Sequence, residues 1–355
     1  MEIDDLLIHM EAHDASDLYL KTGIPPMLRV AGELVVAGEH PLTDEVIGQL
    51  AAQMMTPRHR QEFAERRRAD IAYTSQALGR FRVNVYVQRG SPAVVVRRVK
   101  SRIPSFEELR LPPVLGPLAL APRGLVLLVG QTGSGKSTTL ASMISYRSRL
   151  RTGHIVTIED PIEFIHPDDK SIISQREIGT DCESYSLGLR DALRQSPDVI
   201  LIGEIRDEES ATAAVHFAET GHLVMSTLHS NNASQTLERL LHFFPTSSHE
   251  GVALQLSLNL NAIVSQRLIP LKDGAGRVVA VEVMLSTPRV RELLRKADLA
   301  GVRTVMQSSA GIQEGMQTFD YAVYRLIQRG LIDAETAMSA ADSPNDLRLR
   351  LKGML

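Results

Sequence analysis

The residues best suited to chemistry form a glycine-rich run, Gly130-Gln131-Thr132-Gly133-Ser134-Gly135-Lys136-Ser137, followed by Thr138. The run fits G-x-x-x-x-G-K-[ST], a pattern in which glycines let the backbone wrap closely around phosphate groups. An apolar strand over 125–129 leads in and a helix over 137–149 follows, which argues against a chance glycine turn. We therefore expect an ATP site in which Lys136 contacts the β- and γ-phosphates and Ser137 completes a Mg²⁺ shell.

A carboxylate follows a second apolar run. The stretch 199–202 is a hydrophobic strand that leads through Gly203 to Glu204. An acid at the end of a strand beside the phosphate loop is typical of a Walker B segment, which holds Mg²⁺. Glu204 stands where aspartate is usual, and we expect it to take that role.

A third strand, over 155–158, delivers Glu159, Asp160 and Glu163 around a proline. Hydrolysis of a phosphoanhydride needs a carboxylate that orients and deprotonates the attacking water. Acids at the carboxyl end of a strand face the ligand crevice of an open α/β sheet. Residue chemistry alone does not choose among the three, and one of them could simply cap a turn.

A fourth strand, over 223–225, follows Gly221 and ends in Thr227 and His229. A lone histidine in such a place is more often a hydrogen-bonded structural residue than a catalyst. The residues alone therefore leave the role of His229 open between these two interpretations.

The elements that must position these residues indicate an α/β chain. Unbroken apolar runs at 124–129, 155–158, 199–202 and 223–225 alternate with amphipathic helices, which is typical of a parallel sheet buried on both faces. We expect this core to span 124–287 and a helical region to span 288–355. The helices expected in that region are 289–296, 318–328, 334–341 and 345–351.

The first hundred residues predict a smaller α+β domain. Helical spacing marks 4–13 and 44–55, and clean alternation over 80–88 predicts a strand. A second strand over 94–99 would complete a hairpin through a Gly90-Ser91-Pro92 turn. Five prolines in 104–123 indicate an ordered linker, placed at 101–123, between the domains.

Composition excludes several classes of function. The net charge of −3, with no Trp and only seven Tyr and eight Phe, does not favour direct binding of nucleic acid. The single cysteine rules out an internal disulfide and a four-cysteine zinc module, and it fits a reducing cytoplasm. The acidic N-terminus predicts no export signal, and no apolar stretch has the length of a transmembrane segment. Work at a membrane would need partners.

The four chemical segments, in this order and spacing, resemble those of the secretion and pilus ATPase superfamily. The stretch 158–163 resembles its Asp box, 196–206 its Walker B segment with glutamate for aspartate, and 218–229 its His box. Similarity to the PilT/PilU-type twitching motility ATPases extends to 79–84 and 315–320, and so covers nearly the whole chain.

Within that branch the chain looks more like PilU. The tail over 341–349 resembles the PilU C-terminus. At 289–296, PilT retraction motors carry Ala-Ile-Arg-Asn-Leu-Ile-Arg-Glu, whereas this chain reads Arg-Val-Arg-Glu-Leu-Leu-Arg-Lys. The difference favours an accessory motor over one that retracts pili alone.

The resemblance implies a homohexameric ring with a PAS-like N-terminal domain over 1–100 and a RecA-like P-loop NTPase domain. It implies that Glu163 is the water-activating base, that Glu204 holds Mg²⁺, and that His229 senses the γ-phosphate or couples subunits. It also makes Arg82 and Arg97 arginine fingers, which would stabilise charge on the transferring phosphoryl group. The plainer interpretation of both arginines is a solvated sheet edge.

The resemblance thus implies an ATP-hydrolysing motor that powers or assists type IV pilus retraction, with ATP and Mg²⁺ as cofactors. Its expected partners are a PilT-like ATPase and a PilC-like pilus platform membrane protein, at the cytoplasmic face of the inner membrane. Three alternatives stay open. They are a pilus-assembly or type II secretion ATPase, which usually carries a four-cysteine zinc motif, a DNA-translocating RecA-like ATPase, and a nucleotide-binding subunit that hydrolyses poorly.

Overall fold

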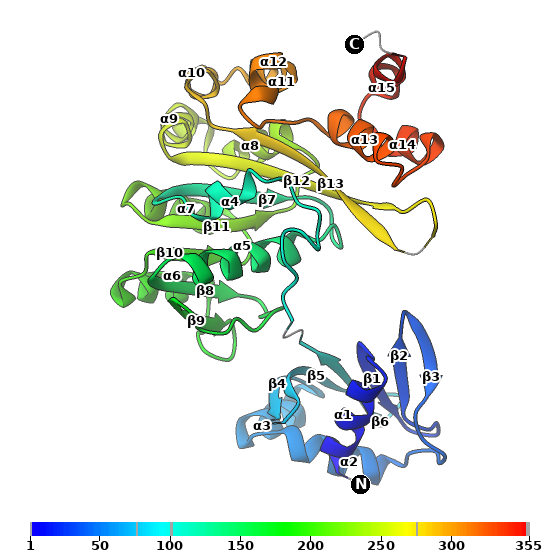
Figure 1. Ribbon diagram of the computed structural model, residues 1–355. Helices are drawn as coiled ribbons and strands as arrows, with labels where there is room; N and C mark the ends of the chain where they lie inside the picture. Colours follow the sequence, from blue (N-terminus) through cyan, green and yellow to red (C-terminus); the bar gives the residue numbers. More distant parts are fainter. Residues whose placement is uncertain (1, 76, 100–101, 275, 353–355) are drawn as a thin grey trace. The chain divides into compact units, whose positions relative to one another are not determined.

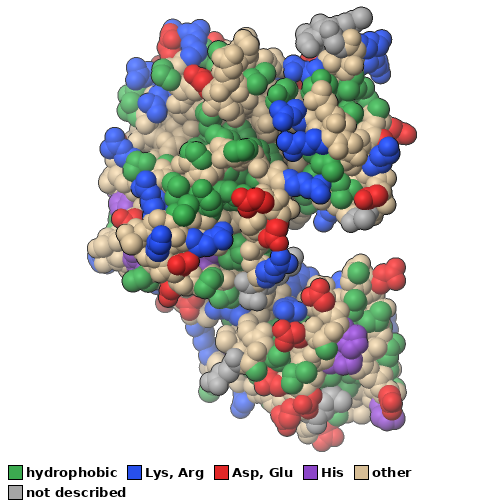
Figure 2. All heavy atoms as spheres, in the orientation of Figure 1, with side chains coloured by type: hydrophobic (Ala, Val, Ile, Leu, Met, Phe, Trp, Pro, Cys, Tyr) green, Lys and Arg blue, Asp and Glu red, His purple; other side chains and the backbone are tan. Residues whose placement is uncertain are grey.

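The computed structural model describes residues 2–75, 77–99, 102–274 and 276–352. Two compact units make up this part of the chain (Figure 1). The first contains Met1–Arg102 and Glu163–Ile165, and the second contains Ile103–Ile162 and His166–Leu355. On the face shown in Figure 2, acidic and basic side chains occur together on each unit, which fits the small net charge of −3.

The first unit is built on a six-stranded antiparallel sheet of order β3-β2-β1-β6-β5-β4. Helix α1 buries Ile3, Leu6, Leu7 and Met10, one face of a helical repeat, in the core of this unit. Its elements are α1 (Ile3–Ala12), β1 (Asp17–Lys21), β2 (Met27–Val30), β3 (Glu33–Val36), α2 (Asp44–Met54), α3 (Pro57–Arg66), β4 (Arg68–Ser75), β5 (Gly79–Gln88) and β6 (Ser91–Arg98).

The helices predicted at 4–13 and 44–55 and the strand at 80–88 are confirmed. The turn predicted at Gly90-Ser91-Pro92 is wrong, because Ser91 and Pro92 already belong to β6. The turn consists of Arg89 and Gly90, with φ of 50° and 85°. Two consecutive residues with positive φ match the twist of a tight hairpin.

The second unit has a seven-stranded sheet of order β13-β12-β7-β11-β10-β8-β9, in which only the β12–β13 pair is antiparallel. Strands β7, β10 and β11 are buried along their whole length, as predicted from their unbroken apolar runs. The strands are β7 (Gly124–Val129), β8 (Gly153–Glu159), β9 (Ser171–Glu177), β10 (Val199–Ile202), β11 (Leu223–Leu228), β12 (Leu260–Pro270) and β13 (Arg277–Leu285).

Helices cover both faces of this sheet (Figure 1). The four C-terminal helices predicted from the sequence are present as α10, α13, α14 and α15, whereas α11 and α12 were not predicted. The helices are α4 (Leu115–Ala119), α5 (Lys136–Leu150), α6 (Tyr185–Ala192), α7 (Glu208–Glu219), α8 (Ala233–His242), α9 (His249–Asn259), α10 (Pro288–Arg295), α11 (Leu299–Gln307), α12 (Ser309–Gln313), α13 (Phe319–Gln328), α14 (Ala334–Ala340) and α15 (Pro344–Leu351).

The proline-rich segment expected to be a linker packs on the second unit instead. Leu111, Leu115 and Leu118 are buried in the same cluster as core residues of β7 and α5. Arg147 on α5 donates hydrogen bonds to the carbonyls of Ala119 and Ala121. From Ile103 on, the proline-rich segment therefore forms part of the second unit. Residues 100 and 101 lie outside the described part of the chain.

Across the described residues, the helices all lack either the length or the apolar character that a membrane span requires.

Candidate active site

The order of the strands brings the carboxyl ends of the four strands that lead into the predicted chemical segments to one edge of the sheet. Strands β7, β11, β10 and β8 are neighbours and run parallel, so their carboxyl ends lie together. Ligands of open α/β sheets bind outside such an edge. The glycine loop follows β7, Glu204 follows β10, and His229 follows β11, as the sequence predicted.

The glycine loop has a backbone that other residues would strain. Gly130, Gly133 and Gly135 have φ of 149°, 78° and 91°. A Cβ on Gly130 would lie 2.5 Å from the carbonyl oxygen of Gln266, so glycine is required there for space as well. The loop delivers its backbone to the N-terminus of α5, where N–H groups favour an anion.

Lys136 is the first residue of α5, and its side chain turns back over the loop. Its ammonium group donates to the carbonyl oxygens of Gly130 at 2.7 Å and Gln131 at 3.0 Å. The residue is buried, with 8% of its surface exposed. A positive charge is thereby held within the curve of the loop.

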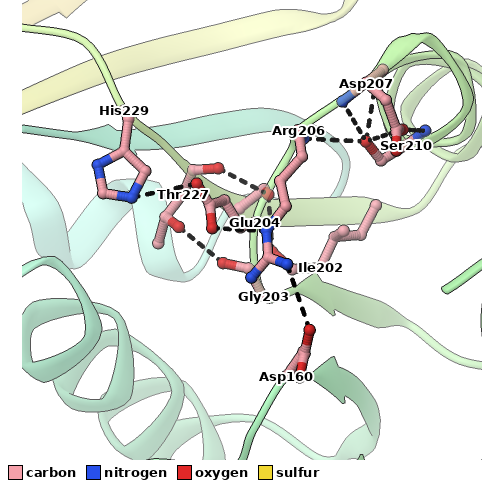
Figure 3. Close-up of polar contacts among 10 residues, drawn as sticks. Asp160, Ile202, Gly203, Glu204, Arg206, Asp207, Ser210, Thr227 and His229 are labelled. Atoms are coloured by element: carbon pink, nitrogen blue, oxygen red, sulfur yellow. Dashed lines mark hydrogen bonds and ion pairs between the residues drawn. The ribbon is translucent and has the colours of Figure 1, made fainter. Parts of the chain in front are cut away.

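Glu204 lies between the side chains of His229 and Arg206 (Figure 3). Its Oε1 lies 3.1 Å from Nε2 of His229, and its Oε2 accepts a hydrogen bond of 2.8 Å from Nε of Arg206. The same guanidinium donates at 3.2 Å to Asp160, which follows β8. Arg206 therefore ties together the acids that follow two neighbouring strands.

The backbone at Gly203 explains how Glu204 reaches this position. A Cβ on Gly203 would lie 2.9 Å from the hydroxyl of Tyr185 and 3.2 Å from the carbonyl oxygen of Ile158. The carbonyl of Gly203 accepts a hydrogen bond of 2.7 Å from the Thr227 hydroxyl. Burial raises the pKa of Tyr185, so this hydroxyl stays neutral beside the acids.

The three acids near Pro161 differ in their surroundings. Glu159 accepts hydrogen bonds from Thr157 at 2.7 Å and from Gln175 at 3.1 Å, and Asp160 pairs with Arg206. Glu163 is exposed, as Asp160 is, but it begins the short stretch that groups with the first unit. Glu159 and Asp160 thus both have hydrogen-bond or ion-pair partners within the second unit.

Arg82 and Arg97 lie directly opposite each other on β5 and β6. Both strands are internal to the sheet, so the two arginines do not lie on a sheet edge, but the Arg97 side chain is 62% exposed to solvent. Arg97 donates from Nε at 2.7 Å to the buried carboxylate of Asp17, and this hydrogen bond raises the pKa of Arg97. Arg97 therefore also has a structural contact within the first unit.

Three cavities in the described part of the chain adjoin the glycine loop. One of about 770 Å³ is lined by Gly130, Gln131 and Thr132, by the segment after β11, and by α8. A second, of about 370 Å³, lies between the loop and β12. The third, of about 290 Å³, contacts Thr138 and Gln266. Its apolar lining comes from Leu109, Leu111, Leu268, Leu271, Val278 and Val279.

A family model described as "Type II/IV secretion system protein" matches residues 8–316, most of the chain. The chain belongs to this family. It is 47% identical over 352 residues to the "Type IV pilus ATPase PilU" of Pseudomonas aeruginosa, covering 99% of this chain and 92% of that protein. It is 40% identical to the "Type IV pilus retractation ATPase PilT" of the same organism, covering 98% of this chain and 100% of that protein.

A solved structure of this family confirms the predicted fold class. The crystal structure of the pilus retraction motor PilT with bound ADP matches 98% of this chain and 99% of its own, with a TM-score of 0.91 and 40% sequence identity. The PilT/PilU resemblance, carried by 79–84 and 315–320 beside the four segments, is confirmed, and identity to PilU is higher than identity to PilT.

Sequence reasoning missed residues that hold the site in place. Arg206 follows Glu204 by two positions, and that proximity of opposite charges was the available signal. Glu177 on β9 is buried and accepts a hydrogen bond of 3.1 Å from the backbone N–H of Ile162. Glu282 on β13 is likewise buried and accepts one of 2.8 Å from the N–H of Ala233. Neither glutamate lies near its partner in sequence.

Glu282 predicts an unusual dependence of stability on pH. Burial raises its pKa to about 7 from an ordinary 4.5, against the lowering effects of the Ala233 N–H, the Ser265 hydroxyl and Arg267; Asp342 adds to the rise. Because the folded state binds this proton more tightly than the unfolded state, the wild type loses stability as pH rises through about 7.

Glu282→Gln removes this titration while preserving shape. We compare the free energy of unfolding of the variant with that of the wild type. Relative to the wild type, the variant should be about 3 kcal/mol more stable at pH 9 than it is at pH 4. Urea unfolding at both pH values measures the difference. An equal difference between the two proteins at both pH values would contradict the raised pKa.

Proposed function

We propose that this chain is a motor ATPase that powers or assists type IV pilus retraction. The proposal rests on one observation. Lys136 in its glycine loop, Glu204 and His229 all lie at the carboxyl ends of neighbouring parallel strands. Nucleotide phosphates need a concave set of N–H groups and a cation, and this edge offers both. Relatives named as PilU and PilT ATPases support the same reaction.

ATP binding would use residues 130–138. Lys136 would exchange the loop carbonyls of Gly130 and Gln131 for oxygens of the β- and γ-phosphates. The apolar cavity beside Thr138 is of a size and character suited to a nucleotide base, since bases bury flat apolar faces. The loop glycines keep the backbone close enough for its N–H groups to reach the phosphates.

Mg²⁺ suits the donors present at this edge. The hydroxyl of Ser137 and the carboxylate of Glu204 are oxygen ligands, and Mg²⁺ typically takes one or two protein oxygens and completes its shell with phosphates and water. Among the described residues, no group of three or more His, Cys, Asp or Glu is placed to hold a metal ion, and such a site does not need one. When bound, the ion would neutralise charge on the phosphates.

Hydrolysis would rely on an acid from the segment after β8. We assign Glu163 as the base that orients and deprotonates water, because Glu159 and Asp160 are engaged elsewhere. His229, which lies 3.1 Å from Glu204, would sense the γ-phosphate or couple subunits. Arg82 and Arg97, paired across two internal strands, would act as arginine fingers.

The motor would work as a homohexamer in which the N-terminal unit, PAS-like and over 1–100, moves against the RecA-like unit over 124–287 with its helical region 288–355. Because residues from Ile103 on group with the second unit, the linker about which the units would move is shorter than the 101–123 segment. A PilT-like ATPase and a PilC-like platform protein would be the partners, at the cytoplasmic face of the inner membrane.

An assay of purified protein tests the function. We expect ATP hydrolysis that does not change when DNA is added, and capture of the chain by an immobilised PilT-type ATPase. Strict dependence on DNA would instead support a translocase. Nucleotide binding without turnover would support the subunit that only reinforces a partner ring.

Replacing Arg206 with alanine tests the contact that holds Glu204. Loss of the guanidinium leaves Glu204 and Asp160 without their shared cation, so we expect turnover to fall about 10- to 100-fold. Steady-state phosphate release measures the effect. Arg190→Ala, on the exposed surface of α6, is the matched control and should keep wild-type turnover. Equal turnover in both variants would remove Arg206 from the site.

A further inference from the structure

The segment between β11 and α8 carries His229 and forms part of the wall of the cavity of about 770 Å³ beside the glycine loop. Asn231 in this segment accepts a hydrogen bond of 3.5 Å from the side chain of Gln131, a residue of the loop. Asn232 caps α8 by accepting from the N–H of Gln235 at 2.9 Å. The position of His229 therefore depends on where the first turn of α8 is fixed.

Glu282 fixes that turn from a different part of the fold. Its Oε1 accepts hydrogen bonds from the N–H of Ala233, the first residue of α8, at 2.8 Å and from the hydroxyl of Ser265 at 3.2 Å. Ser265 and Glu282 are direct partners across β12 and β13, so the carboxyl group is held by the sheet itself. Helix α8 packs on both strands.

Burying a carboxyl group at this position is energetically unfavourable. Glu282 is 5% exposed, and burial of an acid is unfavourable unless its contacts compensate. Arg267, the neighbouring cation, is itself 2.7 Å from Asp342 and stacks over Phe319. Sheet packing alone would be served by an apolar residue, as it is at Ala280 and Met284, which share the face of β13 with Glu282. The acceptor at the α8 N-terminus therefore has a use beyond packing.

We infer that Glu282 is a positioning residue that anchors the start of α8 and thereby holds His229 and Asn231 beside the glycine loop for ATP hydrolysis. The inference rests on the proposed function. It assigns Glu282 no contact with the nucleotide. Glu282 acts by accepting the hydrogen bond from the backbone N–H of Ala233. Another side chain with an acceptor oxygen in the same place can therefore replace Glu282.

Three variants test the inference. Glu282→Ala removes the acceptor, whereas Glu282→Gln keeps an oxygen that can accept from Ala233 and Ser265. Thr287→Ala is the matched control, since it removes the cap of α10, which accepts from the N–H of Val290. Hydrogen–deuterium exchange of residues 229–236 reports the anchor directly, and ATP turnover reports its consequence.

We expect Glu282→Ala to exchange at least about tenfold faster over 229–236 and to lower kcat about 10- to 100-fold with little change in KM. Glu282→Gln should restore both readouts to within about threefold of wild type, and Thr287→Ala should change neither. If Glu282 only stabilised the fold, Glu282→Ala and Thr287→Ala would both be less stable than the wild type. Glu282→Ala would then show no loss of kcat that Thr287→Ala lacks.

Unchanged exchange over 229–236 in Glu282→Ala, or wild-type kcat despite faster exchange, would overturn the inference. Failure of the proposed function is a separate result, because it would show as absent turnover in the wild-type protein. The exchange measurement on Ala233 stays informative about the anchor in either case.

Discussion

Lys136→Ala is expected to abolish ATP turnover, with a loss of at least about 10³-fold. The ammonium group is the cation held within the glycine loop, and it is largely shielded from water. Charge on phosphate oxygens is stabilised most by a fixed cation in such surroundings. Phosphate release under saturating ATP measures the effect, and binding of a fluorescent ATP analogue should be lost with it.

The control for this change is Lys170→Ala, which removes an exposed lysine from the same unit. It should keep wild-type turnover, and circular dichroism should show both variants folded. If Lys136→Ala hydrolysed ATP at the wild-type rate, the glycine loop would not be the phosphate site. The whole assignment of the sheet edge would then be wrong.

Much of the fold could be predicted because its central strands are simple in composition. Strands β7, β10 and β11 are buried on both faces, so they appear in the sequence as unbroken apolar runs. Strands β9, β12 and β13 were missed because they contain polar residues with particular partners. Gln266 in β12, for example, is buried and donates to the Thr139 hydroxyl at 2.8 Å.

The residues of the site likewise fall into those that could be predicted from the sequence and those that could not. Its four segments follow a motif or a strand end, so local sequence was enough to find them. The residues that hold them were not found, because their contacts join distant parts of the chain. Glu282 and Ala233 are 49 positions apart, and Arg206 reaches Asp160 across 46. Only the order of the strands makes these residues neighbours.

Glu163→Gln is expected to lower turnover by at least about 10²-fold while nucleotide binding persists. The amide cannot accept the proton of the attacking water, but it has nearly the shape of the carboxylate. Glu163 is exposed, whereas Glu159 already accepts two hydrogen bonds and Asp160 is paired with Arg206. A base needs a carboxylate that is not already committed to a neighbour, whereas Glu159 is held by Thr157 and Asp160 by Arg206.

Glu159→Gln and Asp160→Asn are therefore the matched controls for this prediction. Each makes the same chemical change within four residues of Glu163. We expect these variants to keep turnover within about tenfold of wild type, because their carboxylates position neighbours and do not transfer the proton. Single-turnover measurements with bound ATP separate the chemical step from binding and release. A loss of the chemical step in Asp160→Asn with a normal Glu163→Gln would move the base to Asp160, and Arg206 would then be the residue that sets its protonation.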